Sequence, residues 1–329
     1  AVILDCTEPF RQPVAKDPGP GLFPDARGPR EPGFIPVWQL NCVFGRNLPC
    51  ATIPFARMKS INDKMLDAPP FQQQGIELIL KTLRESAEPV HIVSFGSARA
   101  ISVAYNRDPA LFRTKLARLH LCAGGSSPPA PGYIEWNVAL DPLAIVCLLR
   151  SDLPIALYPD AANNAGEKGY GVFSPAFSYD EHNTFWKLPD LSFIPRMAPP
   201  LRRYLEFAFG RSARADFLRA MEADGPPLPE ATLAKEHYVW ETAVWICVSG
   251  RKLVKRADGT CRIVPAAEVQ PTDRVLPNEL RPCSVTVRDD GIYEYRETSG
   301  PSNVSVYYRG DPRENEAALR EALPALYVS

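Results

Sequence analysis

The chain has 329 residues, of which 45% are apolar, so it can form one large α/β domain or two modest ones around a buried core. This composition excludes global disorder. Lysine and arginine (37 together) almost balance aspartate and glutamate (38 together). Without a broad basic field we expect no nucleic-acid partner, and the expected ligand is a small neutral or polar molecule.

No run approaches the roughly 18 consecutive apolar residues of a membrane span, and the N-terminus lacks the charged-then-apolar pattern of a signal peptide. We therefore expect a soluble protein without a membrane partner. The expected location is cytoplasmic, or secreted or periplasmic if a leader has been removed. The eight cysteines are scattered without a CxxC pair, which favours reduced core thiols over disulfides or metal ligands.

The chain begins with a short apolar strand, Ala1 to Leu4, which ends at Asp5 and a long Pro/Gly loop. Loops at strand ends are where α/β folds bind ligands. Helical spacing and apolar strand runs then alternate at the separation expected of βαβ units. In order, the predicted elements are helix 34–44, strand 48–55, helix 71–86, strand 90–95, helices 97–105 and 108–116, and strand 119–123.

Asp141-Pro142 is predicted to open a helix that runs to Leu149, because aspartate is a natural N-cap and proline suits the first helical position. Strand 154–158 follows and ends in a polar loop. A helix over 201–221, interrupted near Gly210, precedes a helix or helix–strand pair over 236–248.

From about Arg251 the chain becomes β-rich. The predicted strands are 252–255, 261–265, 284–288, 292–296 and 304–308, with a last helix over 312–326. Asp289-Asp290-Gly291 is a hairpin turn signal between two of these strands. We therefore expect an α/β fold with an open, mostly parallel sheet over residues 1–250. A β-rich extension with a terminal helix, 251–329, is expected to pack on this core.

Five sequence pieces between about Phe34 and Val248 resemble the inosine-uridine nucleoside N-ribohydrolase (nucleoside hydrolase) family and occur in its order. The last piece stands where the family has a Glu-Phe-Asn box followed by Asp-Pro. The pieces are Gln74-Gly75-Ile76-Glu77-Leu78-Ile79, Val90-His91-Ile92-Val93-Ser94-Phe95-Gly96, Asn106-Arg107-Asp108-Pro109, Leu119 to Gly125, and Glu135-Trp136-Asn137 with Asp141-Pro142.

The resemblance implies a pocket at the carboxyl ends of the parallel strands and a bound calcium ion. In the family this ion orients the attacking water and binds two ribose hydroxyls, an aspartate serves as general base, and the chains form dimers or tetramers. Cleavage of an N-glycosidic bond builds positive charge on the ribose, so carboxylates around the ring are useful. A hard cation such as calcium prefers oxygen ligands.

The family's aspartate-rich signature after the first strand is incomplete here, since only Asp5 stands in that position before Cys6-Thr7-Glu8-Pro9. Either Asp5 is a remnant of the signature, or Ala1 to Asp5 corresponds to the family's second strand. A helix followed by strand 48–53 favours the second reading. In both, Asp5 faces the pocket as a catalytic and metal-binding candidate. Arg99 replaces a threonine whose backbone carbonyl contacts the metal, and a carbonyl survives that replacement.

Other site residues also follow from the resemblance. The family's His-Asp pair corresponds to His237-Tyr238, so His237 is a candidate proton donor to the leaving base, or else a structural histidine. Glu241 lies one turn on and is a candidate replacement for the lost carboxylate, and Tyr238 a candidate pocket residue. Asn163, in the loop after strand 154–158, either contacts the ligand or forms a turn.

Glu135 and Asn137 occupy alternate positions around Trp136. In an extended segment both side chains would point the same way, with Trp136 directed into the core. They are therefore predicted to bind ribose hydroxyls, against the alternative of a solvated loop at a helix entrance.

The leading prediction is a hydrolase that cleaves the N-glycosidic bond of a nucleoside-like ribosyl substrate. The alternative is a non-catalytic sugar- or nucleoside-binding protein that kept the scaffold and lost calcium. A third reading is a metal-free glycosidase that acts on a different sugar.

Overall fold

The computed structural model describes residues 1–6, 33–129, 134–160, 180–210 and 216–328. The chain divides into two compact units. The first comprises residues 1–37, 48–177 and 280–307, and the second comprises 38–47, 178–279 and 308–329. Helix α1 (Phe34–Phe44) runs from the first unit into the second.

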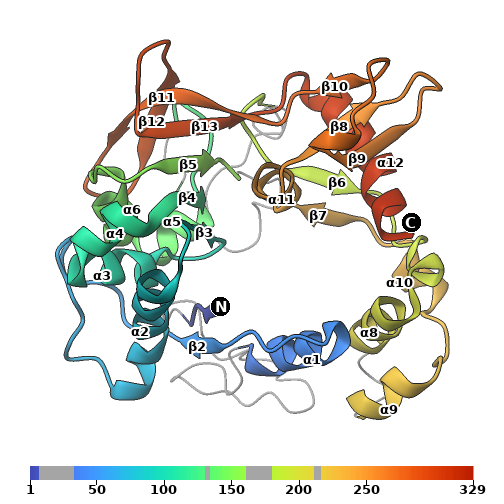
Figure 1. Ribbon diagram of the computed structural model, residues 1–329, viewed down its shortest axis with the longest axis horizontal. Coiled ribbons are helices and arrows are strands. Elements are labelled where there is room, and N and C mark those ends of the chain that lie inside the picture. Colours follow the sequence, from blue (N-terminus) through green and yellow to red (C-terminus); the bar gives the residue numbers. More distant parts are fainter. Residues whose placement is uncertain (7–32, 130–133, 161–179, 211–215, 329) are drawn as a thin grey trace. The chain divides into compact units, whose positions relative to one another are not determined.

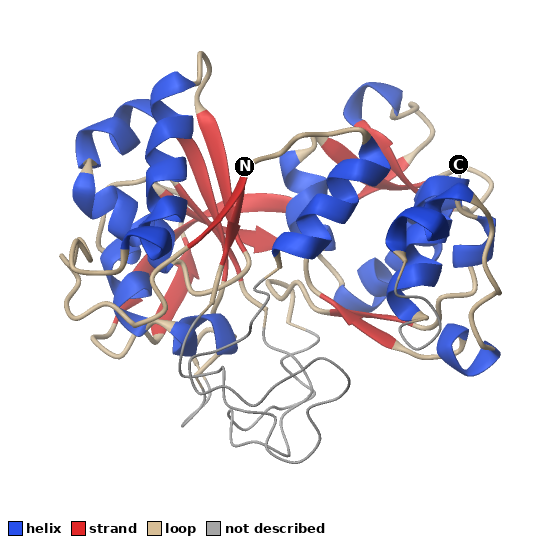
Figure 2. Ribbon diagram, turned by 90° about the horizontal axis from the view of Figure 1, so that it is seen from below, coloured by secondary structure: helices blue, strands red, loops and turns tan. Residues whose placement is uncertain are grey.

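The first unit contains a sheet with strand order β12-β11-β13-β5-β4-β3 (Figures 1 and 2). Neighbours among β3, β4, β5 and β13 are parallel, whereas β11 and β12 form an antiparallel hairpin. The strands are β3 (Val90–Ser94), β4 (Leu116–Cys122), β5 (Ile155–Tyr158), β11 (Glu279–Val287), β12 (Tyr293–Glu297) and β13 (Val304–Tyr308). The predicted α/β fold with a mostly parallel sheet is confirmed.

A separate parallel pair joins β1 (Val2–Leu4) to β2 (Cys50–Thr52). The helices of the first unit lie in the same part of the chain as β3 to β5 (Figure 1). They are α2 (Pro70–Glu85), α3 (Arg99–Arg107), α4 (Pro109–Lys115), α5 (Trp136–Leu140) and α6 (Pro142–Leu149).

Helix α2 shows how the sequence pattern produces this packing. Ile76, Ile79, Leu80 and Leu83 follow helical spacing, and all of them are buried in the core of the first unit. Burying each such side chain contributes about 1.5–3 kcal/mol. Gly75 lets the helix approach β2 closely, because a Cβ there would lie 2.6 Å from the Thr52 carbonyl oxygen.

The second unit holds the sheet β10-β8-β9 and the antiparallel pair of β6 and β7. Its strands are β6 (Trp186–Leu188), β7 (His237–Val239), β8 (Arg251–Lys255), β9 (Cys261–Pro265) and β10 (Arg274–Leu276). Its helices are η2 (Ile194–Arg196), α8 (Pro199–Phe209), α9 (Phe217–Glu222), α10 (Glu230–Leu233), α11 (Thr242–Val248), η3 (Ala266–Glu268) and α12 (Pro312–Val328). A second apolar core includes Trp186, Leu253 and Leu319.

The β-rich character after Arg251 is confirmed, but its strands divide between the units. β8, β9 and β10 lie in the second unit, whereas β13 pairs with β5 and extends the parallel sheet of the first. The boundary expected near residue 250 therefore differs from the division of the structure. The predicted hairpin turn joins β11 to β12, with Gly291 at φ +83°.

All eight cysteines lie in the described ranges and are free, as expected. Among the described helices, none combines the length and the apolar character needed to span a lipid bilayer.

Candidate functional site

The carboxyl ends of the parallel strands β4 and β5 carry a cluster of buried polar side chains. Its central residue is Glu135, the N-cap of α5, which is 5% exposed. One carboxylate oxygen accepts from the Asn137 N–H at 2.7 Å, and the other accepts from the N–H groups of Gly124 (2.9 Å) and Val138 (3.1 Å). Burial raises the pKa of Glu135 to about 7, opposed by these N–H groups and by the nearby Asp160 side chain.

Asn137 ties the two strand ends together. Its side-chain amide donates to the Cys122 carbonyl at the end of β4 (2.8 Å) and to the Asp160 carboxylate beyond β5 (3.2 Å). The Asp160 N–H in turn donates to the Gly124 carbonyl at 3.0 Å. Both amide hydrogens of Asn137 are used in these bonds, so any ligand meets its carbonyl oxygen rather than a free donor.

The local geometry around Trp136 differs from the prediction. The segment is helical rather than extended, and the Trp136 side chain is 43% exposed instead of pointing into the core. Glu135 and Asn137 are nonetheless both buried, because the first is fixed as the helix cap and the second bonds to the strand ends. Sequence reasoning missed Asp160, although the strand that ends two residues before it was recognised.

Tyr293 of β12 closes the cluster on another side. Its hydroxyl donates to the Ala123 carbonyl at 2.5 Å, and its side chain is buried. Burial, with Asp160 and Glu135 among the further contributors, raises the pKa of Tyr293 well above 10. Gly124 accommodates this ring, since its φ is +86° and a Cβ there would lie 2.2 Å from the Tyr293 hydroxyl oxygen.

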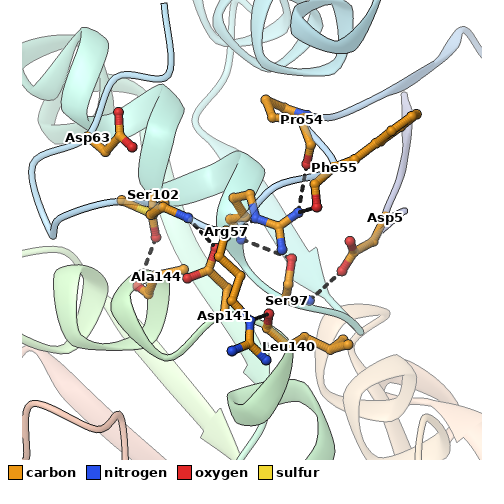
Figure 3. Close-up of polar contacts among 12 residues, drawn as sticks. Asp5, Pro54, Phe55, Arg57, Asp63, Ser97, Ser102, Leu140, Asp141 and Ala144 are labelled. Atoms are coloured by element: carbon orange, nitrogen blue, oxygen red, sulfur yellow. Dashed lines mark hydrogen bonds and ion pairs between the residues drawn. The ribbon is translucent and has the colours of Figure 1, made fainter. Parts of the chain in front are cut away.

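Asp5 lies at the carboxyl end of β1, as the sequence predicts. Its carboxylate accepts from the Ser97 N–H, which follows β3, at 2.6 Å (Figure 3). The contact requires Gly96, because a Cβ at that residue would lie 2.7 Å from the Asp5 carboxylate oxygen. Asp5 therefore links the end of β1 to the turn after β3.

Arg99, at the start of α3, forms a fully buried ion pair with Asp141. Its Nε donates to Asp141 Oδ2 at 2.7 Å, and the two side chains are 0% and 1% exposed. Arg99 Nη1 also donates to the Pro54 carbonyl at 2.6 Å (Figure 3). Burial raises the pKa of Asp141, and the Arg99 charge opposes that rise.

Asp141 does not cap α6 with its side chain, although it stands at the predicted N-cap. The carboxylate instead accepts from Arg99 and from the Met58 N–H at 3.0 Å. Arg57 strengthens the same connection, because its guanidinium donates to the carbonyls of Ala139 (2.5 Å) and Leu140 (2.9 Å). The segment after β2 is thus bound to the start of α6 (Figure 3).

The described residues around Asp5 and Arg99 do not fit a calcium ion. Calcium takes six to eight oxygen ligands, yet in the part of the chain that the structure describes no group of three or more carboxylate, imidazole or thiol ligand atoms includes either residue. Arg99 places a guanidinium beside the carbonyl of Pro54 and the carboxylate of Asp141 instead. The Arg99 backbone lies in the first turn of α3, where its carbonyl serves the helix.

The remaining predicted site residues fall elsewhere. His237 and Tyr238 are in β7 and Glu241 directly precedes α11, all in the second unit. Burial lowers the pKa of His237, with the Lys235 charge adding to this effect. Tyr238 is 41% exposed and packs on Phe185, while Glu241 is exposed. Their roles stay predictions, and Asn163 lies outside the described residues.

No model of a known protein family matches the chain. Over 104 residues it is 36% identical to the pyrimidine-specific ribonucleoside hydrolase RihA of Salmonella enteritidis, which covers 30% of this chain and 32% of the relative. RihA of Escherichia coli is 37% identical over 99 residues, or 28% of this chain and 30% of the relative. The matched stretch thus spans about a third of these relatives. Over that stretch the predicted resemblance is confirmed, and the chain is related in sequence to the ribonucleoside hydrolases.

Two solved structures show a weaker likeness. A plant nucleoside hydrolase is 14% identical, with 88% of this chain and 85% of that chain covered at a TM-score of 0.46. An inosine-uridine preferring nucleoside hydrolase from Bacillus anthracis is 15% identical, with 87% and 83% covered at a TM-score of 0.37. At these scores the likeness carries no weight for function.

Proposed function

We propose that this protein hydrolyses the N-glycosidic bond of a nucleoside-like ribosyl substrate. The observation that carries the proposal is the cluster of Glu135, Asn137 and Asp160 at the edge where β4 and β5 end. The sequence relationship to ribonucleoside hydrolases supports the same conclusion. Ligands of open α/β sheets bind at this edge of the strands.

The cluster's hydrogen bonds indicate what kind of group it accepts. A carboxylate has about four lone-pair sites, and three backbone N–H groups occupy those of Glu135. Asn137 has spent both of its donor hydrogens. What remains is acceptor capacity beside negative charge, so the cluster suits hydroxyl groups, which donate, and repels phosphate and carboxylate groups. A ribose meets this requirement.

The same charges suit the reaction. Positive charge develops on the ribose ring as the glycosidic bond breaks, and a buried carboxyl cluster stabilises that charge more strongly than solvated carboxylates do. Under this proposal Glu135 and Asn137 hold ribose hydroxyls, and Asp5 contributes to the water site. His237 or Glu241 handles the proton of the leaving base. No step passes through calcium, because the described residues do not fit it.

The test is release of free ribose from a panel of nucleosides, including inosine and uridine, at high protein concentration. Asn137→Ala is expected to lower kcat/KM by about tenfold or more, since it removes a bond to each strand end. Asn303→Ala is the matched control. The Asn303 amide also donates to backbone carbonyls, those of Leu153 and Ser151, but at the opposite end of β5.

Three outcomes separate the candidate functions. Ribose release that is lost with Asn137→Ala and kept with Asn303→Ala supports the proposal. Nucleoside binding by calorimetry without any turnover supports the sugar- or nucleoside-binding alternative, which the occupied lone pairs of Glu135 and the poor fit to calcium favour. Turnover of other glycosides that persists after chelation supports a metal-free glycosidase. Added calcium in a parallel assay tests the metal that the resemblance implies.

A further inference from the structure

The position of Asp160 beside Glu135 has a consequence for the charge of the site. Two residues each bond to both acids. Gly124 donates its N–H to the Glu135 carboxylate and accepts from the Asp160 N–H at its carbonyl. Asn137 donates its backbone N–H to Glu135 and its side-chain amide to Asp160. The two carboxyl groups are therefore held as neighbours by shared partners.

The acids also share an environment that disfavours two charges. Glu135 and Asn137 are buried, and the buried Tyr293 ring closes the cluster. No arginine or lysine appears among the hydrogen bonds that the structure describes for Glu135. Two neighbouring carboxylates without a compensating cation cannot both ionise at ordinary pH, so one proton stays on the pair. The raised pKa of Glu135 agrees with this.

We propose that Glu135 and Asp160 act as one acid pair that holds a single proton near neutral pH, and that Asp160 is a positioning residue of the site. The pair then carries one negative charge where the ribose is expected. Asp160 acts through its neighbours, because it holds the Asn137 amide and keeps the charge of Glu135 next to the shared proton. This inference rests on the proposed function for its catalytic meaning but not for its chemistry.

The shared proton is detectable by infrared spectroscopy on the full chain. A protonated carboxylic acid has a C=O stretching band that an ionised carboxylate lacks, and ordinary carboxyl groups with pKa values of about 4 are ionised at neutral pH. The wild-type spectrum minus that of Asp160→Asn is expected to show such a band, which disappears as the pH rises through about 7. In Asp160→Asn the titration near 7 is lost, because the like charge that retained the proton is gone.

Asp152→Asn is the matched control. Asp152 precedes β5 at its other end, where it forms an exposed ion pair with Arg113 at 2.8 Å, and its replacement should leave the band unchanged. Glu135→Gln approaches the pair from the other partner and should remove the same titration, so a folding failure of one variant leaves a second test. A band that titrates near 7 in Asp160→Asn as it does in wild type would overturn the proposal, since the proton would then belong to Glu135 alone.

Kinetics provide an independent measurement. If the wild type releases ribose, Asp160→Asn is expected to lower kcat by about tenfold or more with a smaller change in KM, and to alter the pH profile of kcat/KM. Asp152→Asn should do neither. Absence of wild-type turnover would refute the proposed function while the infrared titration still decides the acid pair. An unchanged pH profile in an active Asp160→Asn variant would refute the positioning role.

Discussion

The buried ion pair of Arg99 and Asp141 offers a direct test of how this edge of the first unit is held together. Replacing Arg99 with methionine keeps much of the side-chain volume but leaves Asp141 buried without a countercharge. Removing one partner of such a pair costs about 3–5 kcal/mol. The upper part of that range is expected, because Arg99 also donates to the Pro54 carbonyl, which would lose its partner.

Arg113→Met is the matched control for this change. Arg113 and Asp152 form an ion pair at 2.8 Å, close to the 2.7 Å of Arg99 and Asp141, but their side chains are 51% and 59% exposed. Exposed pairs contribute about 0–1 kcal/mol. The two variants therefore differ in burial and hardly in distance, so the comparison isolates desolvation.

The assay is urea unfolding of each variant, followed by the free energy of unfolding of the first unit. The Arg99→Met deficit should shrink as the pH falls, because protonation of Asp141 removes the uncompensated charge. The double variant Arg99→Met/Asp141→Leu should recover most of the loss. An Arg99→Met variant that loses no more stability than Arg113→Met would refute the reasoning.

Three further predictions follow from single residues. Burial lowers the pKa of His120 to about 4 from 6.5, so the unfolded chain binds more protons between these values; stability measured by urea unfolding should fall by up to about 3 kcal/mol as the pH drops from 7 to about 4, and His120→Gln should flatten this dependence. Gly75→Ala should destabilise the first unit by over about 1 kcal/mol, since its Cβ would lie 2.6 Å from the Thr52 carbonyl oxygen, whereas Gly300→Ala, with its nearest atom at 3.7 Å, should not. Gly124→Ala should lower both the melting temperature and nucleoside binding, because its φ is +86° and its Cβ would meet the Tyr293 ring; a variant with wild-type values for both would contradict this.

The elements of the parallel core could be predicted from the sequence because each depends on local patterning. The apolar spacing of α2 and the continuous burial of β5 are properties of a few consecutive residues. The strand order could not be predicted in the same way. β13 pairs with β5 although about 150 residues separate them, and nothing in the β13 sequence specifies that neighbour.

The site shows the same division. Glu135 and Asn137 were identified through a resemblance, but their hydrogen-bond partners depend on where β4 and β5 end relative to α5. The choice between extended and helical backbone at Trp136 decides which side chains are buried, and the expected alternation gave the wrong orientation for Trp136. Asp160 carried a usable signal, since it is an acid directly after a buried strand. The pairing of Arg99 with Asp141 spans 42 residues and has no local signature.

The contribution of Tyr293 connects the late strands to the site. Gly124 can serve both acids only because its backbone turns with a positive φ, which directs its N–H to Glu135 and its carbonyl to the Asp160 N–H. The Tyr293 ring occupies the space that a side chain at this position would need, and its hydroxyl holds the preceding carbonyl of Ala123. A residue that reaches the sheet through the β11–β12 hairpin thus supports the backbone turn on which the acid pair depends. The hairpin is therefore part of the site's construction, and shortening it should weaken ligand binding before it unfolds the parallel strands.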